Sequence, residues 1–154
     1  MSHPPVSLRV AQSVMHNAKT LGLERFHSGC CGPVAVAIQR VLFEDTGRYV
    51  IIKRPRAEKV SGHVAVEASW FQPVLFDYTG KSNLDFMREF IGPYERFEIK
   101  SGVKESYVIK HFCPAHLEYN VEQAESLMLD AWDMYLGYEP SRQDDYATQK
   151  RSWR

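Results

Sequence analysis

The stretch HSGCCGPVAVAIQRVL, residues 27–42, decides the fold that we predict for this chain. Turn-forming residues come first, and Pro33 suits the first turn of a helix because its missing N–H is not needed there. An apolar stripe at helical spacing follows, made of Val34, Ile38, Val41 and Leu42. The stretch therefore predicts a buried helix over 31–44 that begins at Cys31.

Helical and β patterns surround this central helix. Apolar residues at helical spacing predict helices over 6–21, 83–91 and 120–136. Segments rich in β-branched and aromatic residues predict about five strands, over 48–52, 63–69, 73–78, 96–99 and 106–112. The strands 63–69 and 73–78 are joined by too few residues for a crossover, so they should form an antiparallel hairpin. We expect one α+β domain over 1–154, with N-terminal helices on an antiparallel sheet, a C-terminal helix and a polar tail over 139–154.

Charge and cysteine content narrow the classes of function. Nineteen basic and nineteen acidic residues give no net charge, which argues against binding to nucleic acid or to an anionic membrane. The N-terminus lacks the apolar segment of a signal peptide, so we expect a cytoplasmic protein. Two of the three cysteines are adjacent, which makes a disulfide framework a poor explanation of the thiols.

Cys31, His63 and Asp77 are the candidate catalytic residues. A thiol at a helix N-terminus is acidified by the unpaired backbone N–H groups and by the helix dipole. His63 opens one strand of the predicted hairpin and Asp77 closes the other. If the loop is 69–71, the pairing puts His63 opposite Asp77 on the same face of the sheet. Such a set supplies a nucleophile, a general base and a group that orients the base.

The order of these residues resembles the papain-like cysteine hydrolases, and most closely the small C39-like cysteine peptidases. The resemblance covers 29–80 and rests on three motifs: Cys31-Gly32-Pro33 with Ala35 and Ala37, Gly62-His63-Val64 with Val66, and Asp77 with Gly80. It implies a papain-like fold and hydrolysis of a peptide, isopeptide or other amide bond in a peptide or protein substrate. Cys31 would be the nucleophile, His63 the base and Asp77 its orienting partner, with no cofactor.

The oxyanion donor is the part of the pattern that this sequence lacks. The related peptidases carry a glutamine a few residues before the nucleophile, but here that region reads LERFHSGC. The backbone N–H of Cys31 offers one donor, and Gln12, His27 and Ser28 are candidates for another. Gly32, beside the nucleophile, and Trp70, in the hairpin, complete the set of candidate substrate-binding residues.

Other interpretations of the same residues stay open. Cys31 alone would be read as a small buried apolar residue, and Cys30 as its packing neighbour turned toward the core. The chain would then be a catalytically silent binding protein, while an acyltransferase would use the same three residues with an amine in place of water. His111, Cys113 and His116 have a spacing compatible with zinc, but no second compact pair of ligands completes the site, so we expect no metal.

Overall fold

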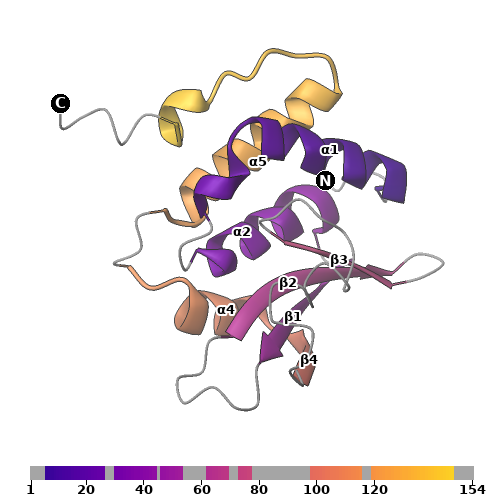
Figure 1. The fold of residues 1–154 in the computed structure, drawn as a ribbon, viewed down its shortest axis with the longest axis vertical. Coiled ribbons are helices and arrows are strands. Elements are labelled where there is room, and N and C mark those ends of the chain that lie inside the picture. Colours follow the sequence, from indigo (N-terminus) through magenta and orange to yellow (C-terminus); the bar gives the residue numbers. More distant parts are fainter. Residues whose placement is uncertain are drawn as a thin grey trace.

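Three helices lie on one face of a four-stranded antiparallel sheet in the computed structural model (Figure 1). The structure describes residues 6–26, 30–44, 46–53, 62–69, 73–77, 98–115 and 119–147. The three helices are α1 (Leu8–Thr20), α2 (Cys31–Ile38) and α5 (Val121–Tyr135), and α2 is sandwiched between the sheet and the other two. The sheet has the order β3-β2-β1-β4, with β1 (Arg48–Lys53), β2 (Gly62–Ser69), β3 (Pro73–Phe76) and β4 (Glu98–Val103). The predicted α+β class is thus confirmed.

The predicted strand over 106–112 is wrong, because this segment forms helix α4 (Glu105–Phe112). Val108 is fully buried and Tyr107 and Phe112 pack partly against the core, a spacing that suits one face of a helix. The guanidinium of Arg40 also binds Glu105 in the first turn of α4. Helix–helix packing therefore overrides the β propensity of the segment, and the described sheet has four strands where the sequence predicted about five.

The central helix is the most buried element of the fold. Every residue over 32–39 is buried, and α2 passes into a π-helical turn (Gln39–Phe43) that ends at Glu44 with a φ of 48°. The sheet face beneath it contributes a row of buried side chains, Tyr49, Ile51, Val64, Val66 and Phe76. A second buried cluster occupies the opposite face of the sheet, formed by Val50, Ile52, Ala65 and Leu75. Alternate residues of β1, β2 and β3 therefore serve two different apolar layers, whereas β4 is largely exposed.

Capping fixes the ends of the outer helices where the sequence placed them. The side chain of Ser7 accepts a hydrogen bond from the N–H of Val10 at 3.2 Å, and α1 ends before Gly22, whose φ is +100°. Asn120 and Gln123 form a reciprocal capping box at the start of α5. The predicted helices over 6–21 and 120–136 are confirmed with small shifts of their ends.

The polar C-terminal segment is held to α5 by a buried carboxylate. Asp130 is fully buried and accepts hydrogen bonds from the backbone N–H groups of Ser141 and Arg142 and from the hydroxyl of Tyr146, which is also fully buried. The guanidinium of Arg142 binds Asp130 and Asp133. The segment up to residue 147 is therefore docked on the domain surface.

Some expectations lie outside the described residues. These are the helix over 83–91 and the first half of the strand over 96–99; residues 98 and 99 of that strand belong to β4. In the part of the chain that the structure describes, no helix is both long and apolar enough to cross a membrane.

Candidate active site

The hairpin of β2 and β3 brings His63 and Asp77 together. Nε2 of His63 lies 2.7 Å from Oδ2 of Asp77, and both side chains are nearly buried. The observed register pairs Ser69 with Pro73, so three residues over 70–72 separate the strands, where the sequence predicted 69–71. Because this shift moves each cross-strand partner by two residues, it keeps every side chain on its predicted face. His63 and Asp77 therefore meet diagonally instead of directly opposite one another.

Cys31 is the first residue of α2, and its thiol meets the same histidine. The thiol of Cys31 is hydrogen-bonded to His63 and also accepts hydrogen bonds from the backbone N–H groups of Val64 and Gly32. Since Asp77 occupies Nε2, the remaining nitrogen of His63, Nδ1, is the one available to the thiol. Cys30 precedes the helix and is buried in the core, as predicted, whereas Cys31 is only partly buried. The two adjacent thiols thus have different environments.

The electrostatics of the cluster favour a thiolate beside an imidazolium. Burial acts to raise the pKa of the Cys31 thiol, but the hydrogen bond and charge of His63 and the two backbone N–H groups lower it below its ordinary value. Burial acts to lower the pKa of His63, but the hydrogen bonds and charges of Asp77 and Cys31 raise it to about 9. Both shifts favour a proton on the ring and a deprotonated sulfur, which is the reactive form of a cysteine.

Gly32 lets helix α4 approach the first turn of α2. A Cβ at position 32 would lie 2.2 Å from the carbonyl oxygen of Phe112, so only glycine fits this contact without movement of one backbone. The end of α4 consequently forms a wall beside the first turn of α2. Gly32 thus has a steric role in the packing of α2 against α4, and its role in substrate binding stays a prediction.

The candidate oxyanion donors have different outcomes. Gln12 lies on the exposed side of α1, which packs on α5, and it is not among the groups that act on the Cys31 thiol. His27, Ser28 and Trp70 lie outside the described residues. The N–H of Val64 points to the thiol but was missed, because a backbone donor leaves no mark in a sequence. The backbone N–H of Gly32, in the first turn of α2, is the other donor that points to the thiol.

Cys113 is the third thiol, and it lies near the other two. Burial and the charges of Cys31 and Cys30 raise the pKa of Cys113 to about 12, which leaves it protonated and unreactive near neutral pH. The described residues contain no group of three His, Cys, Asp or Glu side chains placed to hold a metal ion. His116, the third residue of the possible zinc site considered from the sequence, lies outside the described residues.

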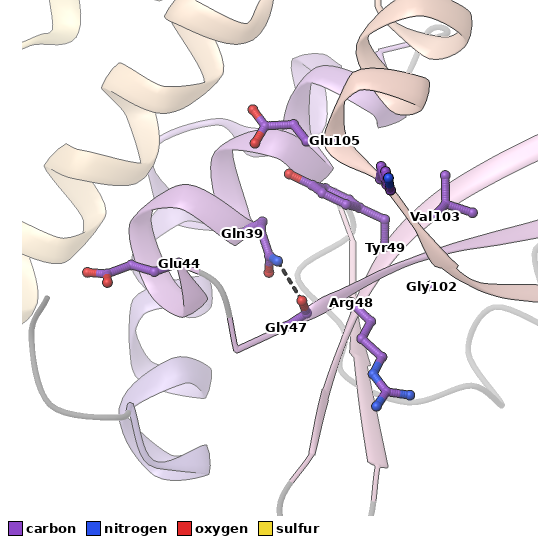
Figure 2. Close-up of a pocket in the computed structure, with 9 residues that line it drawn as sticks. Gln39, Glu44, Gly47, Arg48, Tyr49, Gly102, Val103 and Glu105 are labelled. Atoms are coloured by element: carbon purple, nitrogen blue, oxygen red, sulfur yellow. Dashed lines mark hydrogen bonds between the residues drawn. The ribbon is translucent and has the colours of Figure 1, made fainter.

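A separate cavity of about 310 Å³ lies where α2 ends (Figure 2). The amide nitrogen of Gln39 donates to the carbonyl of Gly47 at 2.6 Å, while Oε1 of Gln39 and the hydroxyl of Tyr49 are buried without a partner among the described residues. Cys31 begins α2 and Gln39 follows its last residue, so this cavity is about 12 Å along the helix from Cys31. Its lining residues take no part in the cluster of Cys31, His63 and Asp77.

Comparison with known proteins gives no match: no family model, no curated protein and no solved structure is similar to the chain. Its function has to be argued from the geometry of its own residues.

Proposed function

We propose that the chain is a thiol-dependent hydrolase that cleaves a peptide, isopeptide or other amide bond through Cys31, His63 and Asp77. One observation carries the proposal: a partly exposed thiol at a helix N-terminus shares a hydrogen bond with a histidine whose other nitrogen lies 2.7 Å from a buried carboxylate. Each residue alone has an ordinary structural explanation. The three together supply the nucleophile, the base and the orienting group that amide hydrolysis requires.

The reaction that we propose proceeds in two stages. The Cys31 thiolate attacks the carbonyl carbon, a C–S bond forms, and the carbonyl electrons move to oxygen. The backbone N–H groups at the start of α2, with that of Val64 beside the sulfur, stabilise this oxyanion. His63 gives its proton to the amine as the C–N bond breaks, which leaves a thioester. His63 then takes a proton from water, the hydroxide attacks the thioester, and the acid and the thiolate are released.

A papain-like relationship is the fold-level part of the same proposal. It is supported by the chain order of the cluster: the nucleophile begins the central helix, the base lies at the start of β2, and the carboxylate follows β3. This is the order in which the C39-like peptidases carry their motifs.

The experiment is a screen of the full chain against an internally quenched peptide library, followed by mass spectrometry of the protein under turnover. We expect cleavage and a covalent acyl adduct on Cys31. Cys31→Ala should abolish both, while Cys30→Ala, which removes the neighbouring buried thiol, should retain both. No adduct, together with a Cys31 thiol that reacts no faster than an ordinary cysteine, would instead favour the catalytically silent binding protein.

A further inference from the structure

Two buried polar atoms in the cavity at the end of α2 lack a hydrogen-bond partner. Gln39 is 7% exposed and Tyr49 is 4% exposed, and both line the cavity of about 310 Å³ (Figure 2). The amide nitrogen of Gln39 donates to the carbonyl of Gly47, but Oε1 of Gln39 and the hydroxyl of Tyr49 have no partner among the described residues. Buried polar atoms are nearly always paired, because an unpaired one is unfavourable. Both atoms are therefore suited to a polar molecule that enters the cavity.

Two irregular backbone segments line the same cavity. Gln39 begins the π-helical turn (Gln39–Phe43), which ends at Glu44 with a φ of 48°. The register between β1 and β4 shifts after Tyr49, and Gly102, which lies at this shift, has a φ of +74°. A Cβ at Gly102 would meet no atom within 4 Å, so the space beside it is open. Both π-helical turns and β-bulges are frequent at functional sites, and here one of each borders the two unpartnered atoms.

The groups around these atoms set the chemistry of a suitable ligand. Oε1 of Gln39 accepts hydrogen bonds and cannot donate, so it needs a ligand with an N–H or O–H group. Burial and the charge of Glu105 raise the pKa of Tyr49 above its usual value, so the hydroxyl keeps its proton and can donate. Lys104 also lines the cavity, whereas the carboxylate of Glu105 is bound by the guanidinium of Arg40. The hydroxyl and the ammonium together favour an anionic group on the ligand.

The remaining charged residues of the lining do not add to this positive charge. Glu44 and Arg48 belong to the lining, but Figure 2 shows both side chains extending away from Gln39 and Tyr49. One ammonium and one hydroxyl suit a carboxylate, which carries a single negative charge, better than a dianionic phosphate. The volume of about 310 Å³ is at the lower end of the roughly 300–1,000 Å³ of small-molecule pockets, so the ligand is small.

We propose that this cavity binds a small organic carboxylate that also carries a hydroxyl or amine donor. The donor of the ligand binds Oε1 of Gln39, and its carboxylate accepts hydrogen bonds from the hydroxyl of Tyr49 and the ammonium of Lys104. The site is separate from the cluster of Cys31, so this inference does not rest on the proposed function.

The test compares small molecules of similar size that differ in one group. L-Lactate and L-alanine carry a carboxylate and a donor, propionate lacks the donor, and lactamide lacks the charge. Each is added to the isotope-labelled full chain, and the NMR signals of the Gly47 and Gly102 amides measure binding. We expect L-lactate or L-alanine to bind at least about tenfold more tightly than propionate and lactamide. Equal binding of propionate or lactamide, tighter binding of inorganic phosphate, or no shift with any of these molecules would overturn the proposal.

Tyr49→Phe separates ligand binding from folding. Because the hydroxyl has no partner among the described residues, its removal should leave the midpoint of chemical denaturation unchanged or raise it, while the tighter ligand binds about tenfold more weakly. Tyr138→Phe is the matched control: Tyr138 is 66% exposed and does not line the cavity, so both the midpoint and the affinity should stay the same. A lower midpoint in Tyr49→Phe would mean that the hydroxyl is already paired in the free protein, and unaltered affinity would mean that it does not touch the ligand. Either result would contradict the proposed site.

Discussion

The substitution Asp77→Asn isolates the charge that holds the proton on His63. Asparagine keeps the shape of the side chain and an oxygen that accepts from Nε2, 2.7 Å away, so the ring keeps its orientation. The rise of the His63 pKa from 6.5 to about 9 corresponds to about 3 kcal/mol in favour of the protonated ring, and Asp77 is the main group that opposes the effect of burial. We therefore expect the His63 pKa to fall by at least about one in the variant, a loss of about 1.4 kcal/mol or more.

The assay is an NMR titration of the His63 ring in the folded protein, with the rate of Cys31 alkylation measured near neutral pH on the same samples. The alkylation rate should fall in Asp77→Asn, because an imidazole that binds its proton less tightly leaves more of the thiol protonated. Glu67→Gln removes a carboxylate from β2, the strand of His63, and should leave both the His63 pKa and the alkylation rate unchanged. An unaltered His63 pKa in Asp77→Asn would mean that the carboxylate contributes no charge stabilisation to the ring.

Three further substitutions test the packing around the site by chemical denaturation. Gly32→Ala places a Cβ 2.2 Å from the carbonyl oxygen of Phe112 and should destabilise the fold by about 1–3 kcal/mol; unchanged stability would mean that α4 moves freely. Tyr146→Phe removes a hydrogen-bond donor from the buried carboxylate of Asp130 and should lower the free energy of unfolding by about 1–3 kcal/mol. An unchanged denaturation midpoint would mean that water replaces the hydroxyl. Asn120→Ala removes the N-cap of α5 and should lower the free energy of unfolding by about 1 kcal/mol. Asn120→Ser, whose side chain can still cap the helix, should lower it much less.

The hairpin shows why much of the site could be predicted from the sequence. The side-chain period of a strand is two, so a register error of two residues changes the partner of His63 without changing its face. The predicted loop was displaced by one residue, and the contact between His63 and Asp77 survived that error. Cys31 could be placed because Pro33 marks the first turn of a helix in the sequence itself.

The segment SYVIKHF shows where such prediction fails. Seven residues rich in Tyr, Val, Ile and Phe suit both a strand and a short helix, and a period cannot be read from so short a segment. Contacts far along the chain decide the outcome, among them the ion pair of Arg40 with Glu105 and the approach of Phe112 to Gly32. The same long-range packing places Cys113 beside Cys31, which no local pattern could indicate.

The thiolate–imidazolium pair is tested most sharply by the pH dependence of Cys31 alkylation by iodoacetamide, with Cys113 as the internal reference. If the thiolate–imidazolium pair exists, Cys31 reacts with a midpoint below the ordinary thiol pKa of 9.0, while Cys113 stays slow until the pH approaches about 12. Replacement of His63 by alanine should return the Cys31 midpoint toward, or above, the ordinary value, because burial then acts unopposed by the imidazolium. A Cys31 midpoint at or above 9.0 in the unaltered chain would contradict the thiolate–imidazolium pair and, with it, the proposed hydrolase.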